Sequence, residues 1–198
     1  INAWPSLLEN ITFEMPVFLI SIFYEVNDLA IYTIITRIFC LPLSYCSSAF
    51  SNILLSYSSK KIRQNKSIYK DVKKLLIFIS FFMGFILLLM ISFSDFLIPT
   101  IFGLKWSNTV LFFKILLPSI VLRELGYSLG TTILSNNRSE IIGLWQIFAF
   151  LISSISLIYS STFLDFKGII IIISVINSCL YLIYIVCILY ASKKPKFI

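Results

Sequence analysis

Long apolar runs separated by short polar connections occupy most of this 198-residue sequence. A helix needs about 20 apolar residues to cross the ~30 Å hydrocarbon core of a bilayer, and only helices or closed barrels satisfy the backbone there. Six runs are long enough, at residues 5–24, 28–57, 72–93, 108–134, 139–163 and 168–191. The sequence therefore predicts an all-α protein, a polytopic membrane bundle of six transmembrane helices that form a single lobe.

Composition supports this class and argues against enzymes. The hydrophobic share is 59%, well above the roughly 45 to 50% of soluble domains, and the chain contains no histidine. Histidine-based catalysis is thereby excluded. The four cysteines lie in apolar runs without a C-x-x-C spacing, so we expect no disulfide and no metal site. We expect neither a cofactor nor an enzymatic activity.

Basic residues gather in alternate connections. Seven follow the second run against the single acid Asp71, Arg138 follows the fourth run, and three lie in the C-terminal tail. The opposite connections carry only Lys105 and Lys167. Because segments rich in Lys and Arg stay in the cytoplasm, both ends of this chain are expected on that side. We interpret the basic loop as an orientation signal near anionic headgroups, not as a nucleic-acid site.

Two of the charges assigned to the membrane interior lie at matching depths. Glu14 precedes Tyr24 by ten residues and Arg37 follows Asp28 by nine, which places both roughly 14 to 15 Å from the same end at about 1.5 Å per residue. A charge at mid-bilayer costs roughly 2.5 to 3.5 kcal/mol. Two interpretations of Arg37 stay open. It forms an ion pair with Glu14 that joins the first two helices, or it forms a cationic site that binds an anionic substrate and whose charge Glu14 partly offsets.

Three further charges, which complete a set of five, lie in the fourth run. Lys114 is near the start of this run, so its side chain is expected to snorkel to the interface. Arg123 lies about 180° from Lys114 around a straight helix, and Glu124 lies about 80° from it. Arg123 is a second candidate for a substrate contact, with an ion pair to Glu124 as the alternative. The candidate substrate-binding residues are therefore Arg37, Arg123, Glu14 and Lys114.

Polar and kinking residues mark the remaining spans. Gln146, Asn177 and Ser178 lie deep in the last two runs and are interpreted as interhelical hydrogen-bond partners. Pro16, Pro42 and Pro118 each remove a helical hydrogen bond inside a span. Such interruptions occur where helices bend around a cavity, and also in static kinks.

Short motifs along the chain resemble the C-terminal half of polysaccharide flippases of the Wzx type. Residues 95–106, Asp-Phe-Leu-Ile-Pro-Thr-Ile-Phe-Gly-Leu-Lys-Trp, together with 111–118, are similar to that family's "lfG-x-x-W … iL-x-p" signature. The stretch from Asp28 through Arg37 to Pro42 resembles its "lg-x-y-x-x-a-x-r-i-x-x-x-P" helix, although Leu29-Ala30 replaces the usual glycine. Residues 137–146 are similar to its "g-r … q" segment.

This resemblance implies a member of the superfamily that includes MATE exporters. Its members have two six-helix halves around a central cavity and move undecaprenyl-diphosphate-linked oligosaccharide across the bacterial inner membrane by alternating access. Cationic cavity residues would hold the anionic headgroup. The chain would be the C-terminal half of a longer transporter, consistent with a start at Ile1. Its implied partners are this substrate, membrane lipids, the N-terminal half and other polysaccharide assembly proteins.

Two alternatives remain. A MATE-like cation or drug antiporter needs an unpaired carboxylate in the cavity, whereas the charges assigned to the spans show an excess of cations. A membrane-embedded glycan polymerase or acyltransferase generally needs a sizeable outer loop, and the outer connections here are short. Phe102 to Trp106 is interpreted as an interfacial turn, with Gly103 permitting the reversal.

Overall fold

The computed structural model describes residues 4–64, 67–135 and 139–193, and this part of the chain is helical without a strand. The all-α polytopic bundle expected from the apolar runs is confirmed. The elements are α1 (Trp4–Phe23), α2 (Val26–Ile34), the π-helical turn η1 (Ile35–Phe39), α3 (Cys40–Arg63), α4 (Tyr69–Phe102), the 3-10 turn η2 (Leu104–Trp106), α5 (Thr109–Ser135), α6 (Ser139–Ser161) and α7 (Phe166–Lys193).

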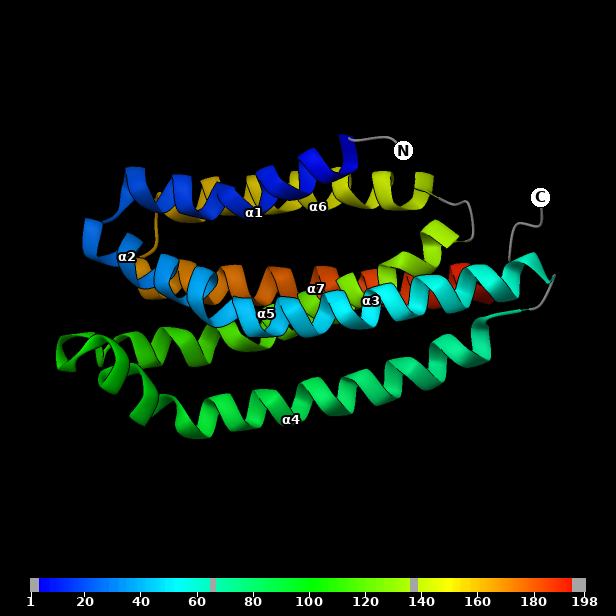
Figure 1. Ribbon diagram of the computed structural model, residues 1–198. Coiled ribbons are helices and arrows are strands. Elements are labelled where there is room, and N and C mark those ends of the chain that lie inside the picture. Colours follow the sequence, from blue (N-terminus) through cyan, green and yellow to red (C-terminus); the bar gives the residue numbers. More distant parts are fainter. Residues whose placement is uncertain (1–3, 65–66, 136–138, 194–198) are drawn as a thin grey trace.

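The helices form three layers (Figure 1). The middle layer holds α3, α5 and α7, with α5 packed extensively on both of its neighbours. On one side α1 and α6 pack against each other, and on the other side α4 lies against α5. Most of α5 is buried, from Thr109 to Ile133, whereas α4 exposes many large apolar side chains. Because lipid tails are as apolar as these side chains, such exposure fits a membrane-embedded surface.

Four of the helical segments are long and apolar enough to cross a membrane by length and composition: Val26–Arg63, Tyr69–Phe102, Glu140–Ser161 and Phe166–Lys193. Among the described residues α1 and α5 do not meet this measure, so the remaining two of the six expected spans stay a prediction. Both helices carry charged residues, of which Glu9, Arg123 and Glu124 line an interior cavity while Glu14 and Lys114 are partly exposed. In Figure 1, α5 extends along most of the bundle, whereas the shorter α1 lies beside part of it.

The chain is continuously helical from Val26 to Arg63, with a π-helical turn within this segment. The turn covers Ile35 to Phe39 and ends three residues before Pro42. Proline has no N–H to donate to the carbonyl of residue 38, and its ring crowds that carbonyl, so a widened turn upstream relieves the conflict. Arg37 is in this turn. Arg37 therefore projects from a segment whose geometry departs from that of an α-helix.

Two glycines allow geometry that a side chain would obstruct. Gly103 ends α4 with φ of 94°, and its N–H bonds the carbonyl of Pro99 at 2.9 Å, which confirms the expected reversal before Trp106. Gly130 lets α5 approach α7 closely, since a Cβ there would lie 2.8 Å from the hydroxyl of Tyr184. Small residues at helix contacts are typical of membrane bundles.

The expected basic end is only partly described. Lys61 pairs with Asp71 at 2.7 Å and thereby ties the end of α3 to the start of α4. The side of the membrane that this end faces stays a prediction. Four of the basic residues used for the orientation, and the start of the 137–146 motif, lie outside the described residues: Lys66, Asn137, Arg138, Lys194 and Lys196.

Candidate functional site

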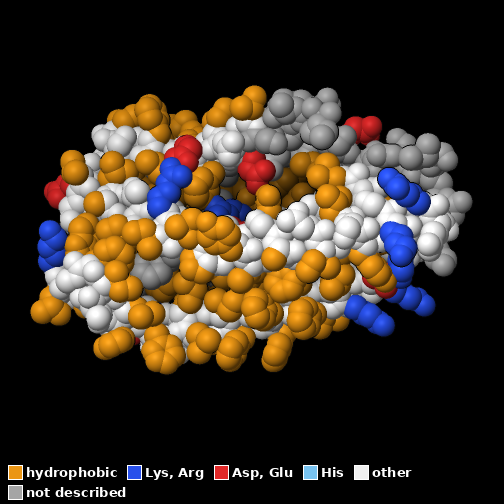
Figure 2. All heavy atoms as spheres, viewed as in Figure 1, with side chains coloured by type: hydrophobic (Ala, Val, Ile, Leu, Met, Phe, Trp, Pro, Cys, Tyr) orange, Lys and Arg blue, Asp and Glu red, His pale blue; other side chains and the backbone are white. Residues whose placement is uncertain are grey.

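A cavity of about 480 Å³ lies between the α1–α6 layer and the middle layer. Its lining comes from every helix of these two layers, and α4 contributes none of it. Figure 2 shows a hollow on one face of the molecule, with acidic and basic side chains inside it and at its edge. Its volume falls in the range of small-molecule sites, about 300 to 1,000 Å³.

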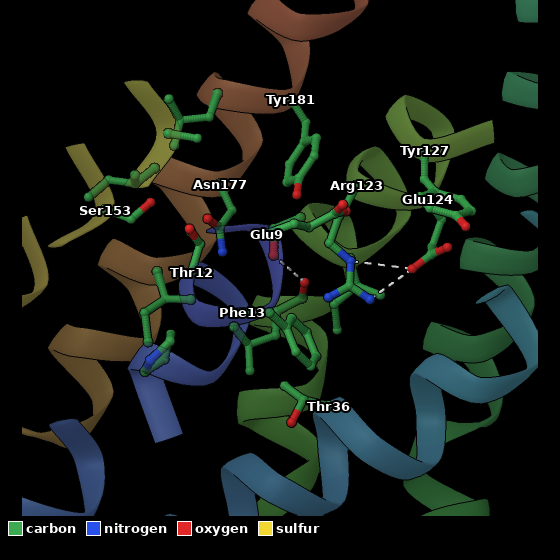
Figure 3. A pocket seen from close by; sticks show the side chains of 18 of the residues that line it. Glu9, Thr12, Phe13, Thr36, Arg123, Glu124, Tyr127, Ser153, Asn177 and Tyr181 are labelled. Atoms are coloured by element: carbon green, nitrogen blue, oxygen red, sulfur yellow. Dashed lines mark hydrogen bonds and ion pairs between the residues drawn. The ribbon is translucent and has the colours of Figure 1, made fainter. Parts of the chain in front are cut away.

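Arg123 is the cation inside the described cavity, and two groups hold it. Its guanidinium lies over the ring of Phe13, 4.4 Å from the centroid, so α5 meets α1 there through a cation–π contact. Its Nη2 lies 2.8 Å and its Nε 3.3 Å from the same carboxylate oxygen of Glu124 (Figure 3). Glu124 is 4% exposed, so Arg123 also neutralises a buried carboxylate.

Arg37 forms the ion pair with Glu14 that their equal depth suggested. The Nη2 atom of Arg37 lies 2.5 Å from a carboxylate oxygen of Glu14, and the pair links η1 to α1. It is not buried, because the two side chains are 50% and 47% exposed. The guanidinium of Arg37 also lies 5.6 Å from the centroid of the Phe13 ring, which makes the cation–π contact with Arg123 as well. One aromatic side chain thus connects the exposed guanidinium to the one in the cavity.

Lys114 lies outside the cavity. Its Nζ pairs with Asp95 of α4 at 2.7 Å, in a pair whose side chains are 35% and 69% exposed. This agrees with the expected half-turn separation of Lys114 from Arg123. The structure therefore brings together Arg37, Glu14 and Arg123 around Phe13 and leaves Lys114 apart from them.

Glu9 is a cavity residue that sequence reasoning missed. It lies inside the expected first span, although it was not counted among the interior charges. Among the described residues it forms no ion pair, and its side chain extends toward Tyr181 and Arg123 (Figure 3). Its spacing in the sequence could have indicated this position. Glu9 lies four residues before Phe13 and seven before Pro16, and residues with these spacings share one helix face.

The charge balance corrects the expected excess of intramembrane cations. The described lining holds the carboxylates Glu9 and Glu124 and the guanidinium Arg123, and the nearby Arg37–Glu14 pair is neutral. Since Lys114 is paired elsewhere, the cavity has no cationic surplus. An anionic ligand would therefore have to compete with Glu124 for Arg123 and with Glu14 for Arg37.

Gln146 and Asn177 line this cavity, which changes their expected role. Within the described part of the chain neither side chain forms a hydrogen bond, although Gln146 is only 8% exposed. Hydroxyl groups bridge the helices instead: Ser47 donates to the Glu124 carbonyl at 2.8 Å and Ser174 to the Ile115 carbonyl at 2.6 Å. The two amides are thus available to a ligand or to water.

The chain matches a known protein family. A family model described as "Polysaccharide biosynthesis protein" matches residues 2–111, more than half of the chain. Comparison with curated proteins and with solved structures gives no match. The matched region contains Glu9, Phe13, Glu14 and Arg37 and ends within α5, before Arg123.

Proposed function

Because this chain belongs to the polysaccharide biosynthesis protein family, we propose that it translocates undecaprenyl-diphosphate-linked oligosaccharide repeat units across the bacterial inner membrane by alternating access. A role in polysaccharide synthesis or export follows from the family. The flipping of a lipid-linked unit is our proposal, and in it the protein binds and moves its substrate without catalysing a reaction.

The observation that supports this function is the cavity with Arg123 on its wall. A guanidinium stays charged and offers a planar fork that suits phosphate oxygens. Arg123 is 23% exposed and already shares two nitrogens with Glu124, so a diphosphate would exchange for this carboxylate. Arg37 offers a second guanidinium at the exposed end, linked to the first through Phe13.

We further propose that this lobe is the C-terminal half of a two-lobed transporter. The cavity opens on one face instead of being enclosed by the described helices, as expected if a second lobe completes it (Figure 2). The lobe's implied partners are the N-terminal half, membrane lipids and other polysaccharide assembly proteins. Both ends of this chain would face the cytoplasm by the charge of the connecting loops.

One observation favours a second candidate, a MATE-like cation or drug antiporter. Glu9 is a cavity carboxylate without an ion-pair partner among the described residues, which is what cation binding would use. The family match favours the saccharide substrate. Changed drug susceptibility with normal surface glycans, after deletion of the gene, would favour the antiporter.

The test replaces Arg123 in the full-length protein. Arg123→Ala should abolish surface polysaccharide and cause lipid-linked repeat units to accumulate on the cytoplasmic face. Arg123→Lys should retain part of the activity, since lysine keeps the positive charge but lacks the planar guanidinium that donates two hydrogen bonds to one phosphate. Lys114→Ala is the matched control, because it removes a cation of the same helix that pairs outside the cavity. Normal polysaccharide with well-expressed Arg123→Ala would contradict the proposal.

Arg37 needs its own test because its pair with Glu14 can be purely structural. Arg37→Ala should reduce surface polysaccharide if the guanidinium contacts substrate. The exchanged pair, Glu14→Arg with Arg37→Glu, keeps the two charges opposite each other. Restored expression without restored transport assigns Arg37 a substrate role, whereas restoration of both assigns the pair a structural role.

A further inference from the structure

One wall of the cavity carries uncharged polar groups that lack partners. Ser153 is 4% exposed, and its hydroxyl has no hydrogen-bond partner within the described residues. Gln146, about two turns earlier on α6, is equally without a bond there, and Asn177 of α7 extends into the same space (Figure 3). Buried polar groups are nearly always paired, so these groups need water or a ligand.

Aromatic rings and one carboxylate complete this wall. Tyr181 lines the cavity beside Trp145, whose own ring is stacked on Tyr184 at 5.0 Å and is thereby fixed in place. Glu9 extends from α1, which packs on α6, toward Tyr181 of α7 (Figure 3). An aromatic face attracts the polarised C–H groups of a sugar ring, while amides donate and accept hydrogen bonds at its hydroxyl groups and a carboxylate accepts them.

We propose that the wall formed by Glu9, Gln146, Ser153, Asn177 and Tyr181 binds one uncharged, hydroxyl-bearing sugar ring. This inference rests on the proposed transport function and names the part of the substrate that the cavity interior accepts. The charge of Glu9 decides the sugar class. Because Arg123 is engaged by Glu124, it does not cancel Glu9 fully, and a sugar carboxylate would meet a like charge.

The binding test uses the purified full-length protein in lipid nanodiscs and three probes. Methyl glucoside and methyl glucuronide differ in one group, a CH₂OH against a carboxylate. Undecaprenyl diphosphate carries the phosphates without a sugar. Saturation-transfer NMR suits the two weak saccharide probes, and the fluorescence of Trp145 and the other tryptophans reports the tight lipid probe.

The glucoside should bind about tenfold more tightly than the glucuronide, as expected for like charges in one partly buried site. Glu9→Gln should remove most of this preference. Ser153→Ala and Asn177→Leu should each weaken glucoside binding several-fold without changing the affinity for undecaprenyl diphosphate. Ser161→Ala is the control on the same helix, because this hydroxyl already bonds the carbonyl of Ile158 at 2.9 Å. Its affinities should equal those of the wild type.

The two proposals fail in different ways. If undecaprenyl diphosphate binds and Arg123→Ala weakens it, but neither saccharide binds or Ser153→Ala has no effect, the sugar wall is wrong and the transport proposal stands. Equal binding of glucoside and glucuronide by the wild type likewise overturns the assigned sugar class. If undecaprenyl diphosphate itself does not bind, the proposed function fails together with the inference that rests on it.

Discussion

The Glu14–Arg37 pair should couple α1 to η1 with a measurable free energy. Fully exposed ion pairs contribute about 0.2 to 1 kcal/mol, whereas an unpaired charge at mid-bilayer costs about 2.5 to 3.5 kcal/mol. The two side chains are half-exposed, at 50% and 47%, which places the pair between these limits. We expect a coupling energy of about 1 to 2 kcal/mol between Glu14→Gln and Arg37→Gln, because each single substitution leaves the charge of the other residue without its ion-pair partner.

The two single variants should not be equal. Arg37 also lies 5.6 Å from the Phe13 centroid, a contact that Glu14→Gln leaves intact. At this distance and exposure the cation–π term is about 0.5 kcal/mol, so Arg37→Gln should be more destabilising than Glu14→Gln by that amount. The double variant should be less destabilised than the sum of the single variants.

The assay is a double-mutant cycle on the full-length protein, with reversible unfolding by SDS in lipid bicelles followed by tryptophan fluorescence. Each free energy of unfolding is compared with that of the wild type, and the coupling energy is the non-additive part. Strictly additive effects of the two substitutions would refute the reasoning, because they would show that the pair does not stabilise the folded lobe.

Three further predictions concern glycines and orientation. Gly103→Ala should destabilise the lobe by about 1 kcal/mol, measured by SDS unfolding, because φ of 94° strains any L side chain. Gly130→Ala should cost about 1 to 3 kcal/mol through overpacking against Tyr184, and Tyr184→Phe should recover much of this by removing the closest atom. In a cysteine-free background, Lys73→Cys should react with a membrane-impermeant thiol reagent only after the inner membrane is opened, whereas Lys105→Cys should react in intact spheroplasts.

Each of these predictions has a control. Gly84→Ala adds a Cβ with nothing within 4 Å inside α4, so it should leave stability unchanged or raise it by about 0.5 to 1 kcal/mol. Equal changes in the free energy of unfolding for Gly84→Ala and Gly103→Ala would show that the positive φ of Gly103 does not penalise a side chain. Failure of Tyr184→Phe to help Gly130→Ala would show that the hydroxyl is not the obstacle. The reverse labelling pattern would show that the protein has the opposite orientation in the membrane.

The helical class, the reversal at Gly103 and the Glu14–Arg37 pair could all be predicted from the sequence. Each depends on distance along the chain: run length for the spans, local turn chemistry for Gly103, and depth for the pair. Helix rise is nearly constant, so a depth counted from the same end transfers directly to the structure.

The interior of the cavity could not be predicted in this way. Whether Glu9 or Gln146 faces a cavity depends on how α1 and α6 rotate about their axes. In helices that are apolar on nearly every face, the hydrophobic pattern does not determine that rotation. Packing of α1 on α6 does, and it also places Phe13 against both arginines. An aromatic residue in a membrane helix gives no sequence signal for such a position.

Transport by purified protein tests the central claim most directly. In proteoliposomes, the wild type should move a fluorescent undecaprenyl-diphosphate-linked oligosaccharide between the two leaflets. Arg123→Gln should reduce the translocation rate by at least about tenfold, which corresponds to about 1.4 kcal/mol. Lys114→Gln should retain the wild-type rate. Translocation that is equally fast in all three proteins, or absent from the wild type, would contradict the account.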